Sequence, residues 1–457
     1  MQRRKSKQNS DEQSSGKHYL SDEFPVRVLI VAGVLIVSAL VLAIYRITAH
    51  MEPAGLEEFI ELVVTHLRGG FAPEVNERNG YFAYIILAPL VPFFLALLFL
   101  QKKRVIKWMR YVEAAETFLS KYNWVLIIAV LAVFLFGYTS NWPIQFFSPA
   151  LFSGINLLLC LLIFAFVCVL VERDKCEKLV YLALWVACIS AIGFSIWLML
   201  WNEGNPYESS GHYLAYAASV HAVVHGGRTL LLDYFPQYGL YAYVLALVFA
   251  FVPLHIGTFS IVMAVLMLIA FICNYFTLRI LIQNRLLRML AFFNIVYYTI
   301  IFRAIAVNLF DSYFQFHPHR YLFPSILLFL FVKFTTLLNY DDNLSMKSRV
   351  WYCALLFFAA CSIMWNFDTG LVGYAAISVG LGFYALYQSM YDRTQDKRLR
   401  FSVHWKFFFG FLLGVPIFFI SVLQIITFFR SGIFLSLEHL HNAFFFQRVF
   451  YNSTLDP

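Results

Sequence analysis

Long apolar runs recur along most of the chain, separated by short polar or charged stretches. Each run is about 20 residues long, which is the length an α-helix needs to cross a bilayer. The runs do not alternate between apolar and polar positions, as the strands of a spanning β-barrel would. The pattern therefore predicts an all-α polytopic membrane protein with about 11 transmembrane helices, at residues 26–48, 81–100, 123–140, 150–171, 178–201, 257–282, 288–305, 320–339, 350–365, 370–388 and 405–429.

The basic residues set the expected orientation of these helices. Cytoplasmic loops of membrane proteins are enriched in Lys and Arg. With the basic N-terminus inside, every cluster of basic residues falls in an inner loop, no outer loop contains a lysine, and the C-terminus lies outside. The clusters are Lys102–Arg110, Arg173–Lys178, Arg285–Arg288, Lys347–Arg349 and Arg393–Arg400.

One apolar segment, residues 238–254, does not fit this register. If it crossed the membrane, every later loop would invert and Arg393–Arg400 would lie outside, against the positive-inside rule. We therefore expect this segment to lie in the outer leaflet or dip into it, ending near Pro253. A true span is the alternative.

Composition agrees with a membrane protein and divides the chain into regions. The sequence is 61% hydrophobic and 13% charged, and the charged share is about half of the ~25% usual in soluble domains. The net charge of +8 reflects the inner loops rather than nucleic-acid binding. The run after Pro25 is too long for a signal peptide, so we expect an uncleaved first helix. The expected regions are a disordered cytoplasmic tail (1–25), a four-helix region (26–175), a membrane module (176–429) with an outer loop (202–256), and an outer tail (430–457).

The cysteines argue against disulfides and a cysteine metal site. Six of the seven lie in apolar runs, and Cys176 lies in a short charged loop. None falls in an outer loop, and no pair has zinc-ligand spacing.

The polar segment from Ser209 to Gly239 is the strongest candidate for a functional site. Ionisable residues kept beside a bilayer usually serve function. We expect an interfacial helix at 213–224, with Ser209 or Ser210 as its N-cap and Gly226 as its stop. Arg228 and Asp233 follow the glycine pair.

Two histidines of this segment, His221 and His225, share a helical face at i and i+4. This spacing can hold a metal, but no third ligand follows closely. Interfacial histidines are the favoured interpretation, and no metal ligand is assigned.

A second polar cluster lies at the outer end of the predicted helix 288–305. Arginine holds phosphate oxygens bidentately, which favours a site shared with Asp233; helix-end anchoring and an ion pair between Asp311 and Arg320 are the alternative. The cluster contains Arg303, Asn308, Asp311, His317, His319 and Arg320. Weaker candidates are Asp368, as a helix cap, and the tail residues Glu438, His439, His441 and Arg448.

The sequence HYLAYAASVHAVVHGGRTLLLDYFPQYG, which begins at His212, carries a family resemblance. An interfacial helix, a glycine break, an aspartate, then Pro-x-Tyr-Gly and an apolar helix resemble the first large outer loop of the GT-C glycosyltransferases, especially uncharacterised bacterial members. The resemblance covers roughly residues 180–429 and implies their seven-helix module, with 238–254 as the juxtamembrane helix. Asp311 falls in the next outer loop, where several of these enzymes carry a second acidic residue. At the place of the usual acid after the first module helix stand Glu203, Glu208 and His212.

The resemblance implies a membrane glycosyltransferase in the bacterial inner membrane that moves a sugar from a polyprenyl-phosphate donor to a glycan, lipid or protein acceptor on the outer face. It implies membrane lipids and a membrane-protein partner as further contacts, no nucleic acid, and leaves the need for a divalent cation open. A lipid-linked glycan flippase is the alternative, although the chain lacks the internal repeats and mid-helix charges expected of one; a glycan polymerase or ligase is another. The implied catalytic residues are Asp233, His212, Glu208 and Asp311, and the implied substrate-binding residues are Arg228, Tyr238, Arg303, His317, His319 and Arg320.

Overall fold

The computed structural model describes eleven stretches of the chain rather than the whole of it. The described residues are 40, 43–44, 47, 75–98, 174–201, 210–234, 239–296, 318–338, 345–394, 403–437 and 439–440. The predicted helices at 123–140 and 150–171 lie outside them, as does nearly all of 26–48.

The described residues are helical apart from turns and one isolated bridge between Leu230 and Tyr234. Within them, five helices are long and apolar enough to cross a membrane, which agrees with a helical membrane protein. The helices are α4 (Val75–Leu98), α8 (Asp174–Trp201), α9 (Ser210–Val224), α10 (Tyr241–Phe249), α11 (Ile256–Leu281), α12 (Arg285–Val296), α14 (Leu322–Leu337), α15 (Met346–Trp365), α16 (Phe367–Thr394) and α17 (Val403–Ser431). The candidate spans belong to α8, α11, α15, α16 and α17.

The start of α8 corrects the predicted loop at Arg173–Lys178. The helix begins at Asp174, so Cys176 lies in its first turn rather than in a loop. An acidic residue is favourable at a helix N-terminus because it interacts with the helix dipole. The charged residues at 174–178 were assigned to a loop, but they form the first turn of the helix, so a change from charged to apolar residues did not mark where α8 begins.

The described residues divide between two compact units. The smaller contains α4, residues 375–394 of α16 and residues 403–413 of α17. In it, Phe93 of α4 packs edge-on against Trp405 and Phe409 of α17, with ring centroids 5.7 and 5.5 Å apart. Gly382 of α16 allows a close approach, since a Cβ there would lie 2.9 Å from the Pro92 ring.

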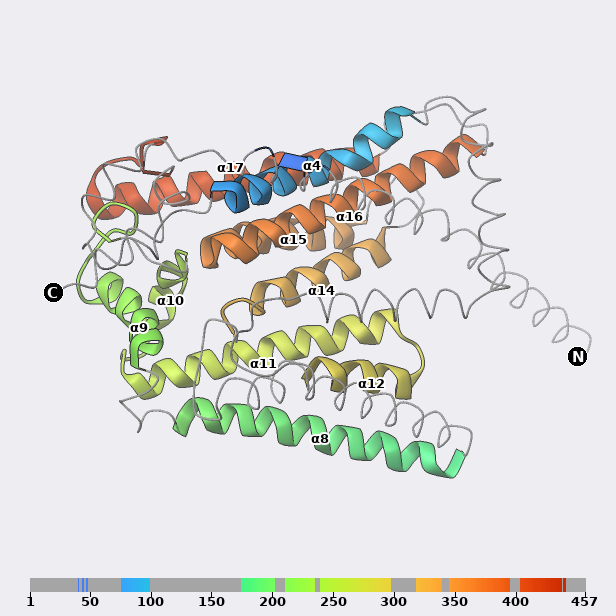
Figure 1. Ribbon diagram of the computed structural model, residues 1–457, viewed down its shortest axis with the longest axis horizontal. Coiled ribbons are helices and arrows are strands. Elements are labelled where there is room, and N and C mark those ends of the chain that lie inside the picture. The colour runs from blue at the N-terminus through green and yellow to red at the C-terminus, as the bar shows by residue number, and fades with distance from the viewer. Residues whose placement is uncertain are drawn as a thin grey trace, which may run out of the picture. The chain divides into compact units, whose positions relative to one another are not determined.

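The larger unit is a bundle in which α11 packs against α8 and α14, and α14 packs against α15 (Figure 1). A polar contact joins two of these helices, because the Asn274 side-chain amide donates to the Ser325 hydroxyl at 3.0 Å. Trp185 of α8 contacts the rings of Tyr275 and Phe292 from α11 and α12. These contacts hold the scaffold that carries the polar end of the unit.

Helices α9 and α10 pack on each other at the end of the larger unit where α8 ends and α11 begins (Figure 1). We call this the α9–α10 end. Helix α10 has nine residues, which is about 13 Å of helix against the ~30 Å of a hydrocarbon core. It is therefore too short to cross, in agreement with the expectation that 238–254 does not span.

Candidate functional site

The link from α9 to the next segment is a glycine break. Helix α9 ends at Val224, and Gly227 adopts a left-handed conformation with φ of +63°. The Arg228 N–H then donates to the Ala222 carbonyl at 2.9 Å, which closes the helix end. The predicted stop was Gly226; the helix ends two residues earlier, at Val224, and the glycine that takes the left-handed conformation is Gly227.

Residues 228–234, which we call the Asp233 loop, close on themselves through hydrogen bonds. The Asp233 N–H donates to the Thr229 carbonyl at 2.9 Å, and the Thr229 N–H donates to the Asp233 carboxylate at 2.8 Å. The Leu231 N–H donates to the Tyr234 carbonyl at 2.8 Å. Thr229 is buried, whereas Asp233 is exposed. The loop therefore fixes the backbone beneath a carboxylate that stays accessible.

Leu231 holds a strained backbone conformation in this loop. Its φ is +69°, and its side chain is only 2% exposed. A bulky residue with positive φ is a genuine outlier, and such strain costs about 1–3 kcal/mol. It persists only where the surrounding structure over-determines the backbone.

Tyr243 of α10 supports the loop from the buried side. Its hydroxyl accepts the Leu230 N–H at 2.7 Å. Burial raises the pKa of Tyr243 to about 12, while the Leu230 hydrogen bond and the charge of Arg430 act to lower it and the charge of Asp233 acts to raise it.

Arg430, in the last turn of α17, forms hydrogen bonds with the backbone on both sides of the glycine pair Gly226–Gly227. Its Nη2 donates to the carbonyls of Val223 at 2.8 Å and of Arg228 at 3.0 Å. Its guanidinium carbon lies 5.9 Å from the centroid of the Tyr243 ring, within cation–π range. Arg430 was not among the residues predicted for the site, although an arginine at the end of a long apolar run, before a predicted outer tail without lysine, was the available signal.

An aromatic cluster surrounds His319 next to the loop. The ring centroids of Tyr216, Tyr241 and Trp365 lie 5.1, 4.9 and 5.5 Å from that of His319. The Trp365 indole N–H donates to the His319 carbonyl at 2.8 Å, and the Tyr241 hydroxyl donates to the Tyr216 carbonyl at 3.0 Å. His319 is fully buried, so its ring is enclosed by this cluster.

The start of α10 is fixed against the end of α15. The Leu240 N–H donates to the Met364 carbonyl at 2.7 Å. Gly239 has φ of +100°, and a Cβ there would lie 2.7 Å from the Trp365 carbonyl oxygen. Only glycine suits both conditions.

The cap of α16 corrects one prediction. Asn366, not Asp368, caps the helix, because its side-chain oxygen accepts the Thr369 N–H at 2.9 Å. Asp368 lies in the first turn, two residues after the cap, where its charge is favourable but where it cannot be the N-cap.

Of the predicted site residues, the structure brings Arg228 and Asp233 together on one loop, beside Arg430. Arg320 adjoins the buried His319, whose ring contacts Tyr216 of α9, so it belongs to the same end. The backbone of His212 lies in the first turn of α9, and its side chain is not described. Glu208, Tyr238, Arg303, Asp311 and His317 lie outside the described residues.

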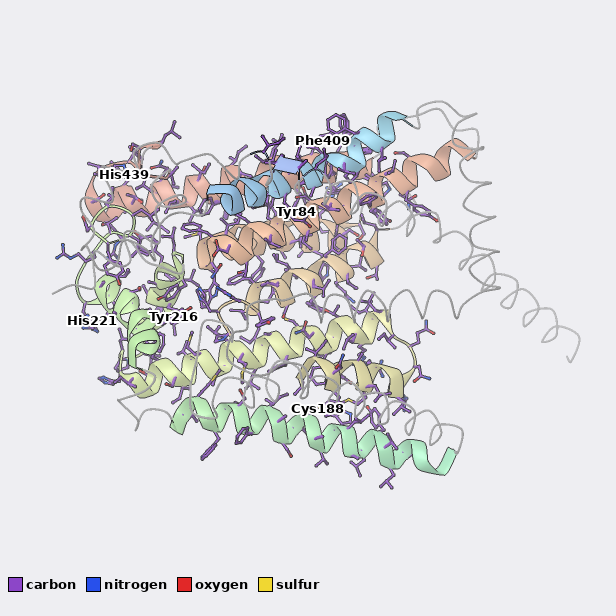
Figure 2. The ribbon with its side chains drawn as sticks, in the orientation of Figure 1. Tyr84, Cys188, Tyr216, His221, Phe409 and His439 are labelled. Atoms are coloured by element: carbon purple, nitrogen blue, oxygen red, sulfur yellow. The ribbon has the colours of Figure 1, made fainter. Side chains whose placement is uncertain are left out.

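Two exposed histidines, His221 in the last turn of α9 and His225 just after it, lie close together. The ring centroids of His221 and His225 are 4.9 Å apart, and Figure 2 shows His221 and Tyr216 on α9. In the described part of the chain, no three His, Cys, Asp or Glu side chains are grouped to hold a metal ion.

The chain matches no protein-family model, no curated protein sequence and no solved structure. Its function therefore has to be inferred from the chemistry and geometry of the α9–α10 end.

Proposed function

We propose that the chain is an integral-membrane glycosyltransferase of the GT-C type, which transfers a sugar from a polyprenyl-phosphate donor to a glycan, lipid or protein acceptor. The observation that carries the proposal is the strained Leu231 two residues before an exposed carboxylate. Backbone strain concentrates at functional sites, where a side chain must be held in one place. The Asp233 loop is held by its own hydrogen bonds, by Tyr243 and by Arg430.

The composition of this end supports transfer from a phosphate donor. Arg228 lies in the loop and Arg430 beside it, and arginine is suited to binding phosphate oxygens. Asp233 would accept the proton of the acceptor hydroxyl as it attacks the anomeric carbon. The arginines, with Arg320, would stabilise the phosphate that leaves.

The remaining residues keep supporting roles in the proposal. His212 and Glu208 are the alternative bases, and Asp311 is the second acidic residue. Further donor contacts are proposed for Tyr238, Arg303 and His317. His319, predicted from the sequence as a further contact, is fully buried among aromatic rings and is proposed only to support this end of the unit.

The proposed topology places this chemistry on the outer face of a bacterial inner membrane. It has eleven spans, with the N-terminus inside and the C-terminus outside, and a seven-helix module at 176–429. The support for it is the distribution of basic residues along the sequence.

The decisive experiment compares Asp233→Asn with wild type. An asparagine oxygen can still accept the Thr229 N–H, so the loop is kept while the base is removed. Turnover should fall about 100-fold or more, since general bases contribute 10²–10⁴-fold. The full chain in nanodiscs is given polyprenyl-phosphate-linked radiolabelled sugars and a cell-envelope extract, and released polyprenyl phosphate is measured.

Two further variants separate the roles. Arg320→Ala should weaken donor binding by about 1.5–3 kcal/mol if it makes a charge-assisted hydrogen bond. Asp368→Asn, at an exposed carboxylate in the first turn of α16, is the matched control and should keep wild-type turnover.

Two outcomes count against the proposal. Wild-type turnover in a well-folded Asp233→Asn protein would remove Asp233 from the mechanism and favour His212 or Glu208. Movement of the intact donor across the bilayer, with no release of polyprenyl phosphate, would indicate a flippase instead.

A further inference from the structure

The chain folds back on α17 after Ser431, in residues 432–437, which we call the foldback segment. Gly432 reverses the direction with φ of +75°. Leu435 then forms two hydrogen bonds with the side chain of Gln424: its N–H donates to the amide oxygen at 2.8 Å, and its carbonyl accepts from the amide nitrogen at 2.9 Å. Figure 2 shows His439, two residues after the segment, alongside the last turns of α17 rather than beyond its end.

The depth of this contact follows from the helix itself. The apolar stretch of α17 is bounded by Lys406 and Arg430, and its 23 residues span about 35 Å, close to the thickness of a hydrocarbon core. Gln424 lies six residues before Arg430, which is about 9 Å deeper along the helix. Leu435, bonded to it, lies at the same depth.

The two hydrogen bonds suit a position away from water. In the hydrocarbon region no water satisfies backbone N–H and C=O groups, so protein groups must do so. The Gln424 amide oxygen accepts the Leu435 N–H, and an N–H of its amide nitrogen donates to the Leu435 carbonyl, so one side chain satisfies both backbone groups of Leu435. A polar amide in a candidate span is likewise costly unless it is hydrogen-bonded. The Gln424 side chain and the Leu435 backbone therefore provide each other with hydrogen-bond partners away from water.

Three apolar side chains of the segment, Ile433, Phe434 and Leu437, are exposed, whereas Leu435 is buried. Phe434 and Leu437 are 62% and 85% exposed, and Phe429 at the end of α17 is 82% exposed. The ring of Phe434 stacks on Phe428 with centroids 4.8 Å apart. Such exposure is expensive in water and favourable in lipid.

We propose that the foldback segment is embedded in the membrane leaflet at the α9–α10 end, with its apolar side chains against lipid acyl chains. Arg430 then lies at the level of the headgroups, which long cationic side chains reach from helix ends. Because Arg430 holds the glycine break, the Asp233 loop lies at the same level. This inference stands independently of the proposed glycosyltransferase activity.

Photocrosslinking to lipid tests the depth directly. p-Benzoylphenylalanine replaces Phe434 or Leu437 in the full chain in its native membrane, and phospholipid adducts are measured by mass spectrometry after illumination. Ile417, 64% exposed in the middle of α17, is the lipid reference, and the exposed His225 is the polar reference. The yield at position 434 should match that at 417 and exceed that at 225 at least about fivefold. A yield equal to that at 225, or adducts mainly to another protein, would overturn the proposal.

A pair of variants tests the role of Gln424. Gln424→Leu removes both partners of Leu435 while leaving an apolar helix, so lipid labelling at position 434 should fall about threefold or more as the segment moves toward water. Thr427→Val is the control, because the Thr427 hydroxyl donates only to the Leu423 carbonyl of its own helix. Unchanged labelling in Gln424→Leu would overturn the role of that residue. If this variant does not fold, the labelling at 434 in the otherwise wild-type chain decides the depth.

Discussion

The phenolic oxygen of Tyr243 lies 2.7 Å from the backbone nitrogen of Leu230 and accepts its hydrogen bond. This contact joins α10 to the residue just before the strained Leu231. Arg430 of α17 holds the same loop at Arg228. Two helices far apart in the sequence therefore fix the backbone that presents Asp233.

Tyr243→Phe should lower the free energy of unfolding by about 1–3 kcal/mol, because it leaves the buried Leu230 N–H without its acceptor. Denaturant unfolding in detergent measures the change. Tyr181→Phe on α8, away from the loop, is the control and should cost less. Equal losses in the two variants would mean that the Tyr243 hydroxyl does not support the loop.

The same tyrosine makes stability depend on alkaline pH. Burial raises the pKa of Tyr243 from 10.0 to about 12. Because the unfolded state loses this proton first, the contribution is complete below pH 10 and is lost as pH rises through 12. The wild-type protein should therefore lose more stability than Tyr243→Phe between pH 10 and 12. Parallel pH curves for the two proteins would contradict this.

Gly227→Ala should destabilise the protein by about 1–2 kcal/mol, the cost of a left-handed backbone for a residue with a Cβ. A steric clash would not cause this loss of stability, since no neighbouring atom lies within 4 Å of a Cβ added at Gly227. Asparagine tolerates this conformation better, so Gly227→Asn should cost less. Gly193→Ala in α8 is the control, because an added Cβ there also meets no neighbouring atom. It should be neutral or stabilising, since alanine favours a helix more than glycine does. Thermal unfolding distinguishes these cases, and an equal effect of alanine at both positions would exclude the backbone explanation.

Arg430→Gln should cost about 1.5 kcal/mol, the low end for hydrogen bonds from a charged donor, because the side chain is exposed. The cost arises from the carbonyls of Val223 and Arg228, which lose their cationic donor. Unfolding of detergent-purified protein is the measurement. Arg279→Gln, an exposed arginine in the last turn of α11, serves as the control and should change stability little. A neutral Arg430→Gln variant would show that the loop is held without it.

The long apolar helices could be predicted closely because their signal is local. The prediction of 257–282 compares with Ile256–Leu281 for α11, and 405–429 with Val403–Ser431 for α17. The short α10 was recognised only indirectly, from the charge of later loops. The cap of α16 was misplaced because Asn366 and Asp368 are both good capping residues two positions apart, and the pattern does not distinguish them.

The ionisable residues of the Asp233 loop could be predicted from the sequence. The residues that hold the loop in place could not. Arg228 and Asp233 stand out as ionisable residues in an apolar chain. Tyr243 and Arg430 act on backbone groups, which carry no residue-specific signal. The strain at Leu231 was equally hidden, because a leucine gives no indication of a left-handed backbone.

The Arg430 contact also has a consequence for biogenesis. Its partner Val223 lies 207 residues earlier in the chain, so at roughly 5–20 residues per second the ribosome needs about 10–40 s to deliver the arginine after the valine. During that interval the nascent chain has made the Asp233 loop but lacks one of its two anchors. The loop therefore has both anchors only after α17 has been synthesised, and a chain arrested before that helix would lack the Arg430 contacts.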